Sequence, residues 1–271
     1  MPTDGPITRV ALVTGAARGI GAATVDRLCG LGYHVVALDL CAESAPDSLP
    51  GVGYALGTAA ELDAVGARHP GRVLPVRADV RDAAALASAA DVAIDAFGRI
   101  DVAVAAAAVI VGGKPLWETP QEHLRTVLDI DAIGVWNTAA AVVPHMLRSD
   151  APHECRFVAV ASAAGERGLF HLAAYNAAKH AVIGMVRGLA ADLVATGITA
   201  VAVSPGSTDT AMLAATADLY NLPSASDLAN SQLVRRLLTP GEVASTVAFC
   251  CSIDAAALNG SVVSATGGFG G

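Results

Sequence analysis

The sequence predicts an α/β fold built on a doubly wound parallel sheet. Short apolar runs alternate with longer helical patterns along most of the 271 residues, an order typical of β-α-β units. Hydrophobic residues make up 54% of the chain and aromatic residues only 4%, which favours helices packed closely on a sheet. This length suits one α/β domain. We therefore expect residues 1–271 to form a single three-layer α/β/α domain.

Seven runs are predicted as parallel strands because each is short, apolar and bounded by turn or polar residues. They are Arg9–Thr14, Tyr33–Asp39, Val73–Asp79, Asp101–Val109, Arg156–Ser162, Ile198–Ser204 and Ser261–Ala265. The longer patterns between them predict helices that bury one apolar face on the sheet. These helices span Gly19–Leu31, Thr58–Ala67, Arg81–Phe97, Gln121–Arg148, Tyr175–Thr196 and Pro240–Cys251.

Two segments interrupt this alternation. The segment 41–72 is longer than a minimal connection between strands and is rich in Pro, Gly and Ser. The segment 206–239 follows the sixth predicted strand and carries Met212, Leu213, Leu219 and Tyr220. Because ligands in open α/β sheets bind at the carboxyl ends of the strands, we expect segment 206–239 to be a lid over the substrate.

Charge and composition argue against several classes of protein. The net charge is −8 and no basic run stands out, so nucleic acid is not an expected partner. The longest uncharged apolar stretch, Val102–Gly113, is too short to cross a bilayer, and the N-terminus lacks a signal pattern; we expect a cytoplasmic protein. The five cysteines are expected to be free and mostly buried. The histidine spacing predicts no metal site.

A glycine-rich loop follows the first predicted strand. The segment Thr14-Gly15-Ala16-Ala17-Arg18-Gly19-Ile20-Gly21 leads from a strand into a helix, the setting of a dinucleotide-binding loop in a Rossmann-type fold. Gly15 permits the tight turn, Gly19 lets the backbone approach the pyrophosphate, and Gly21 lets the helix lie close to the strand. We expect this loop, with Arg18 and Ile20, to bind the phosphates of a dinucleotide.

An acidic residue at the end of the second predicted strand favours NAD. Asp39 follows Gly21 by eighteen residues, close to the spacing at which a carboxylate accepts hydrogen bonds from the adenosine ribose. The carboxylate would repel the 2′-phosphate of NADP more than one exposed Arg18 guanidinium would attract it. Asp79 and Val80 end the third strand at the same edge; they either contact the adenine or cap the strand.

Two side chains with acid–base chemistry share one predicted helix face. Tyr175 and Lys179 are four residues apart and therefore lie on the same side of the helix. Lys179 is one of only two lysines in the chain, and Ser162 ends the preceding strand thirteen residues before Tyr175.

With its glycine loop, Ser162 and Tyr175-x-x-x-Lys179, the chain resembles the short-chain dehydrogenase/reductase family over nearly its whole length. Segments 112–120 and 204–210, with the long segment after Asp39, resemble the mycofactocin-associated subgroup. The resemblance implies that Tyr175 transfers the hydroxyl proton while hydride moves between substrate and nicotinamide. It implies that Lys179 lowers the tyrosine pKa and holds the ribose, and that Ser162 positions the substrate oxygen. It places Pro205, Thr208 and Thr210 at the nicotinamide amide, and implies a homo-oligomer, commonly a tetramer.

The chain departs from the family pattern at three places. Ala105-Ala106-Ala107-Ala108 replaces the usual Asn-Asn-Ala-Gly, so we expect packing to steady this segment; Ala105 stands at a position that the family uses near the cofactor. Asp131 replaces the usual active-site Asn, and Asn137 lies on another helix face. An anionic Asp131 near Lys179 would offset the lysine's effect on Tyr175 and move the activity optimum to higher pH. Thr266 replaces an acidic residue before Gly267-Gly268, a change expected to affect structure rather than chemistry.

The preferred function is an NAD-dependent dehydrogenase that interconverts an alcohol and its ketone or aldehyde. The subgroup resemblance raises the further possibility that NAD stays bound and is reoxidised by mycofactocin. A non-catalytic NAD(H)-binding sensor or scaffold is the alternative from another class. A dehydratase or epimerase would need extra acid–base groups, for which Glu166 and His171 are the nearest candidates. Met212, Leu213, Tyr220 and Trp117 suggest a mostly hydrophobic, uncharged substrate.

Overall fold

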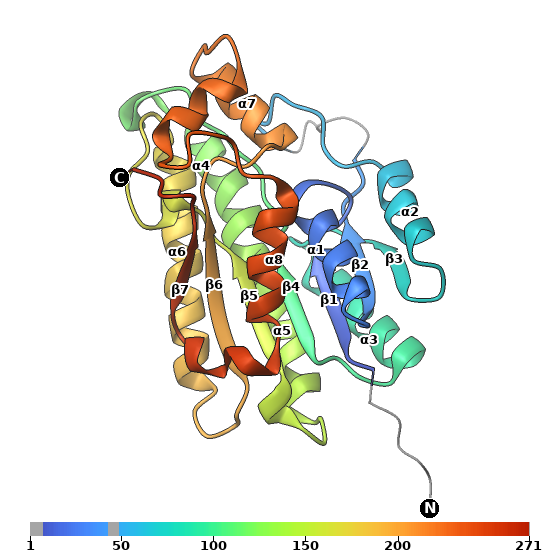
Figure 1. Ribbon diagram of the computed structural model, residues 1–271. Helices are drawn as coiled ribbons and strands as arrows, with labels where there is room; N and C mark the ends of the chain where they lie inside the picture. Colours follow the sequence, from blue (N-terminus) through green and yellow to red (C-terminus); the bar gives the residue numbers. More distant parts are fainter. Residues whose placement is uncertain (1–7, 43–48, 271) are drawn as a thin grey trace, which may run out of the picture.

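A computed structural model describes residues 8–42 and 49–270 of the chain. Seven parallel strands form one sheet in the order β3-β2-β1-β4-β5-β6-β7, with helices on both faces (Figure 1). This confirms the predicted seven-stranded Rossmann-type sheet. The strands are β1 (Val10–Thr14), β2 (His34–Asp39), β3 (Val73–Arg77), β4 (Val102–Ala105), β5 (Arg156–Val160), β6 (Thr199–Pro205) and β7 (Val262–Ala265).

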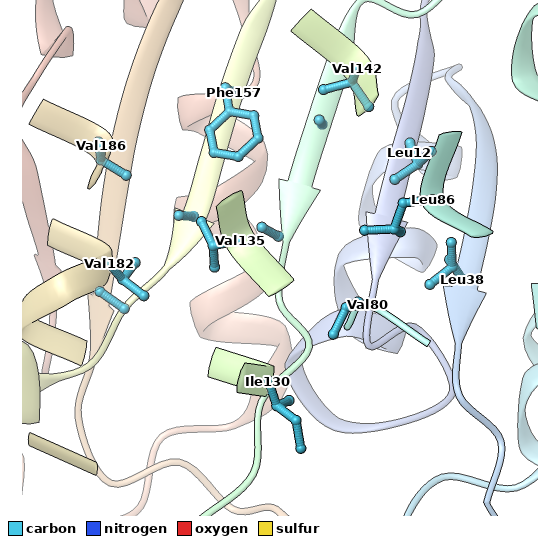
Figure 2. Packing of buried hydrophobic residues seen from close by; sticks show 14 of the residues in the cluster. Leu12, Leu38, Val80, Leu86, Ile130, Val135, Val142, Phe157, Val182 and Val186 are labelled. Carbon is cyan, nitrogen blue, oxygen red and sulfur yellow. The ribbon is translucent and has the colours of Figure 1, made fainter. Parts of the chain in front are cut away.

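Alternate residues of the strands pack on opposite faces, as the period of a strand requires. On β1, Leu12 joins one core with Phe157 and Val142 (Figure 2). Ala11 and Val13 join the other core. The first core is covered by α3 (Ala83–Phe97), α5 (Gly134–Leu147) and α6 (Ala173–Asp192), and the second by α1 (Gly19–Gly30), α2 (Ala59–Arg68) and α8 (Pro240–Cys250). The sheet is therefore buried on both faces.

The predicted helix Gln121–Arg148 contains a local change of winding. It consists of α4 (Gln121–Val127), a π-helical segment (Leu128–Ile133) and α5. Such π segments often occur at functional sites, and Asp131 lies within this one. By length and composition, Gln121–Leu147 is apolar enough to cross a membrane. Because α5 packs on α3 and the sheet core, this run is a core helix of the domain.

The sheet positions the candidate site where its strand order reverses. Thr14 pairs with Leu38 of β2 on one side and with Ala105 of β4 on the other. The carboxyl ends of three strands therefore finish level beside the glycine loop. The predicted strand Asp101–Val109 was too long, because after Ala105 the backbone leaves the sheet to bond with side chains instead.

The lid segment folds into α7 (Ala211–Leu219) and a 3-10 helix at Ala225–Ser231, above the carboxyl ends of the strands (Figure 1). After this, the segment runs beside the C-terminal tail: Leu233 N–H donates to the Gly268 carbonyl at 3.2 Å, and Gly270 N–H donates to the Ser231 carbonyl at 2.8 Å. The remaining short 3-10 helices are Leu116–Glu118, Pro152–Glu154, Ala163–Gly165 and Ile253–Leu258.

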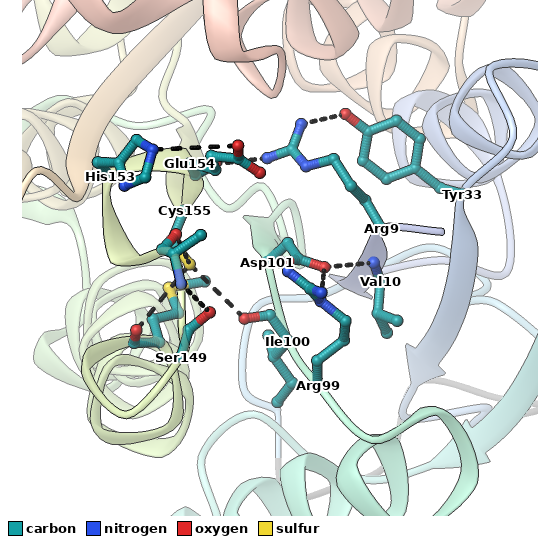
Figure 3. A network of polar contacts seen from close by, with 12 residues as sticks. Arg9, Val10, Tyr33, Arg99, Ile100, Asp101, Ser149, His153, Glu154 and Cys155 are labelled. Carbon is teal, nitrogen blue, oxygen red and sulfur yellow. Dashed lines mark hydrogen bonds and ion pairs between the residues drawn. The ribbon is translucent and has the colours of Figure 1, made fainter. Parts of the chain in front are cut away.

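A polar network closes the opposite edge of the sheet (Figure 3). Asp101 accepts hydrogen bonds from the Arg99 guanidinium at 2.6 Å and from Val10 N–H at 2.8 Å. Arg9 donates to the Tyr33 hydroxyl and to the Cys251 carbonyl. The buried Arg156 guanidinium donates to the carbonyls of His153, Cys155, Ser252 and Ile253. These contacts link the amino ends of the strands to the neighbouring loops.

Candidate active site

A cavity of about 620 Å³ opens at the carboxyl ends of the strands. It is lined by the glycine loop, the segment 49–57, the β4–α4 loop, the start of α6, the lid and the C-terminal tail. Every residue predicted to bind the cofactor or to take part in catalysis lines it, except Ala105 and Asp131, which are both buried. The sequence therefore led to one place in the structure.

The glycine loop has the close backbone packing that a phosphate-binding turn needs. Gly15 has φ +67°, and a Cβ atom there would lie 2.7 Å from the Ala107 backbone. A Cβ on Gly21 would collide with the Gly15 carbonyl. Helix α1 starts at Gly19, and its N-cap residue Arg18 makes no side-chain cap, so the first N–H groups of α1 face the cavity as an anion site would require.

Asp39 is held in place at the end of β2. Its Oδ2 atom accepts a hydrogen bond from Ala17 N–H at 3.0 Å, and its Oδ1 atom accepts one from Cys41 N–H at 3.1 Å. The Arg18 guanidinium, which could pair with a 2′-phosphate, donates instead to the Ala55 carbonyl. A fixed carboxylate and an engaged arginine fit a ribose hydroxyl better than a phosphate.

Asp79 and Val80 line the same end of the cavity. Burial would raise the pKa of Asp79, but hydrogen bonds from Arg81, including Arg81 Nη2 at 2.6 Å, outweigh burial and lower it. Asp79 Oδ1 also accepts from Arg81 N–H at 2.9 Å. Because β3 ends at Arg77, the carboxylate holds the turn after the strand, and its contact with adenine stays a prediction.

Tyr175, Lys179 and Ser162 converge on the middle of the cavity. Helix α6 places the Lys179 Nζ atom 5.6 Å from the centre of the Tyr175 ring, and Nζ donates to the Val160 carbonyl at 3.2 Å. Burial raises the pKa of Tyr175 well above its usual range; the charge of Asp131 adds to this rise, and a hydrogen bond with Ser162 opposes it. The phenol is therefore protonated in the absence of ligands.

Asp131 is fully buried and forms an ion pair with Lys179. Its Oδ2 atom lies 3.3 Å from Lys179 Nζ but has no hydrogen-bond partner, whereas Oδ1 accepts from Val109 N–H at 2.9 Å. Burial raises the pKa of Asp131 to about 6, against the opposing effects of Lys179 and Val109. Asn137 points elsewhere, donating to the Val80 carbonyl at 3.0 Å, so it does not replace Asp131.

Hydrogen bonds from other segments hold the alanine run, so the expectation that packing alone steadies it was wrong. Thr14 Oγ1 accepts from Ala106 N–H at 3.1 Å and from Ala107 N–H at 3.2 Å. Beyond Ala108, the N–H groups of Val109 and Ile110 donate to Asp131 and to the Tyr54 hydroxyl.

The residues assigned to the nicotinamide amide border the cavity below the lid. Pro205 ends β6, and Thr208 Oγ1 donates to the Gly206 carbonyl at 3.1 Å. Thr210 caps α7 by accepting from Leu213 N–H at 3.2 Å. Short-range hydrogen bonds therefore hold the backbone between β6 and α7.

The substrate end of the cavity is apolar, but one predicted contributor is absent from it. Met212, Leu213 and Tyr220 line the cavity as expected. Trp117 does not: its 3-10 turn directs the side chain to solvent, where it is 81% exposed. Glu166 and His171 also lie outside the wall.

Three aromatic residues of the cavity were not predicted from the sequence: Tyr54, Phe170 and Phe269. None of them belongs to a recognised motif. In a chain with only 4% aromatic residues, each aromatic outside a predicted strand or helix was a signal that could have been used. Phe269 belongs to the C-terminal tail, and the Arg167 guanidinium lies 5.9 Å from the centre of its ring.

Comparison with known proteins gives consistent matches. A family model described as enoyl-(acyl carrier protein) reductase matches residues 15–270. A (−)-trans-carveol dehydrogenase of Rhodococcus erythropolis is 37% identical over 188 residues, which cover 68% of this chain and 65% of that protein's length. An NAD-dependent oxidoreductase of Mycobacterium tuberculosis is 37% identical over 193 residues, covering 70% and 68%. The crystal structure of carveol dehydrogenase from Mycobacterium avium in complex with NAD superposes with a TM-score of 0.86 at 28% identity, covering 96% of both chains.

Proposed function

The chain belongs to the short-chain dehydrogenase/reductase family, and from this premise we propose that it is an NAD-dependent oxidoreductase that interconverts an alcohol and its ketone or aldehyde. One observation carries the proposal: Ser162, Tyr175 and Lys179 line the same cavity as the glycine loop and Asp39. When NAD is bound, its nicotinamide ring accepts or returns the hydride.

The side chains of the site supply the proton transfer. Tyr175 takes the hydroxyl proton of the alcohol, or returns it to the carbonyl oxygen in the reverse direction. Ser162 hydrogen-bonds the same oxygen and fixes its distance from Tyr175. Lys179 holds the nicotinamide ribose and favours the tyrosinate through its positive charge. Asp131, 3.3 Å from Lys179 Nζ, opposes that effect while it is ionised.

The substrate is proposed to be a compact, uncharged alcohol such as carveol. The apolar walls from Met212, Leu213 and Tyr220 support a hydrophobic molecule, and the similarity to carveol dehydrogenases supports a substrate of that size. The lid segment 206–239 would then select the substrate, because it contributes these three side chains.

Retention of NAD through turnover is the finer part of the proposal. We define the strap as residues 49–58, which follow Asp39 in the long segment before α2. Leu49 and Val52 are buried in the core, the Ala55 carbonyl accepts from Arg18, and Gly57 sits so close to Ala17 that a Cβ would lie 2.8 Å from its side chain. A strap anchored at both ends across the cofactor groove supports slow release of NAD, with reoxidation by a separate carrier, mycofactocin.

Two further parts of the proposal concern the oligomeric state and the cellular compartment. Ile133 and Trp136 are 43% and 62% exposed at the start of α5, which supports a homo-oligomer, commonly a tetramer, that covers them. All five cysteines are free, which supports a reducing compartment such as the cytoplasm.

The nucleotide content of the purified protein tests the proposal. Denaturant releases any bound nucleotide for identification, and intact protein is then mixed with carveol and other alcohols with and without an artificial electron acceptor. We expect bound NAD and turnover that needs the acceptor. Turnover of free NAD by an empty protein would contradict retention alone, whereas bound nucleotide that no alcohol reduces would favour the sensor or scaffold.

A further inference from the structure

The strap brings a second phenol to the chemical end of the cavity. The Tyr54 hydroxyl accepts a hydrogen bond from Ile110 N–H at 3.1 Å. Its side chain lines the same cavity as Tyr175 and packs against a small apolar cluster that contains Ile110, Leu172 and Tyr175. A residue from the cofactor-covering segment therefore forms part of the wall around the catalytic tyrosine.

Tyr54 and Asp131 hold consecutive peptide groups of one loop. Val109 N–H donates to Asp131 and Ile110 N–H donates to Tyr54. The loop has no polar side chain of its own from Ala105 to Gly113, so its position depends on acceptors from other segments. Ile110 is buried, and loss of the Tyr54 hydroxyl would leave its N–H group unpaired.

The surroundings of Tyr54 define the kind of role it can have. Burial raises the pKa of Tyr54 above its usual range; the hydrogen bond from Ile110 N–H opposes this rise, and the charge of Asp131 adds to it. Tyr54 is therefore a neutral hydrogen-bonding group in the absence of ligands. Because a phenol oxygen can accept while its own O–H donates, the Tyr54 proton stays available to the cavity.

We propose that Tyr54 is a positioning residue that couples the strap to the catalytic group formed by Asp131, Lys179 and Tyr175. This inference rests on the proposed function. With the strap in place, Tyr54 fixes Ile110, the adjoining Val109 fixes Asp131, and Asp131 sets the position of Lys179. When the strap covers the cofactor, the same contact therefore also aligns the residues that transfer the proton.

A double-mutant cycle tests the coupling. Tyr54→Phe removes one oxygen atom, and Asp131→Asn removes the charge at the other end of the loop. Tyr220→Phe is the matched control, because the Tyr220 hydroxyl also bonds a backbone group, the Phe170 carbonyl at 2.7 Å, and also lines the cavity. The readouts are kcat, KM for the alcohol, the pH–rate profile and the rate at which bound nucleotide is released.

We expect Tyr54→Phe to lower kcat by about five-fold with a smaller change in KM, and to speed nucleotide release by a similar factor. Its effect on kcat and on the pH profile should be non-additive with Asp131→Asn, whereas Tyr220→Phe should be additive. The inference would be overturned if the effects of Tyr54→Phe and Asp131→Asn were additive and Tyr54→Phe released nucleotide at the wild-type rate.

Absence of alcohol turnover in the wild type would instead contradict the proposed function. The rate of nucleotide release would then still test whether the Tyr54–Ile110 hydrogen bond holds the strap.

Discussion

At the amino end of the sheet, the buried Asp101 carboxylate accepts hydrogen bonds from Arg99 and from Val10 N–H (Figure 3). At the carboxyl end, Asp131 is equally buried, yet its Oδ2 atom has only Lys179 Nζ at 3.3 Å and no hydrogen bond. Buried charges are costly unless paired and hydrogen-bonded. The amino end meets this requirement and stabilises the fold, whereas the carboxyl end leaves polar groups available for chemistry.

The largest expected effect comes from removing the proton-transfer group. Tyr175→Phe should lower kcat by about a hundred- to ten-thousand-fold, the usual contribution of general acid–base catalysis, while the melting temperature changes little. Tyr33→Phe is the matched control at the amino end, where the hydroxyl accepts from Arg9. Tyr33→Phe should lower stability slightly and leave kcat unchanged. A loss of kcat in Tyr33→Phe, or a loss of stability without a loss of kcat in Tyr175→Phe, would contradict the distinction between the amino and carboxyl ends of the sheet.

An intermediate effect, on stability alone, is expected at Asp101. Asp101→Asn should lower the free energy of unfolding by on the order of 3 kcal/mol, because it breaks a buried pair and leaves Arg99 without its counterion. Denaturant titration measures the loss, and kcat of the remaining folded protein should be unchanged. A stable variant with reduced kcat would show that the amino end also serves the chemistry.

A smaller effect is expected from Asp131→Asn, in the dependence on pH. Because the charge of Asp131 raises the pKa of Tyr175, the variant's alcohol-oxidation profile should shift to lower pH. Burial raises the pKa of Asp131 from 3.8 to about 6 in the folded protein, so the folded protein binds this proton more tightly than the unfolded chain does. The resulting stabilisation is complete below about pH 4 and is lost as the pH rises from about 4 to 6. Wild-type unfolding free energy should fall over that range more than the variant's; matching profiles would contradict the assignment.

The sequence predicted the elements of the fold better than the contacts between distant segments at the site. The sheet, the glycine loop, Asp39 and the Tyr175–Lys179 pair followed from local period and spacing, because strands and helices impose fixed repeats. The hydrogen bonds of Tyr54 to Ile110 and of Asp131 to Val109 join segments 56 and 22 residues apart, and no repeat encodes such contacts. Trp117 was placed wrongly for the same reason: whether a loop aromatic faces a cavity or solvent depends on how distant segments fold over it.

The most direct test of the account is a single-turnover experiment. NAD-loaded protein is mixed with carveol carrying hydrogen or deuterium at the carbinol carbon, without any acceptor, and the absorbance of reduced nicotinamide is followed. The account predicts reduction of one nicotinamide per site, slowed by deuterium and abolished in Tyr175→Phe. Equal reduction in Tyr175→Phe, or no reduction by any alcohol in a protein that holds NAD, would contradict it.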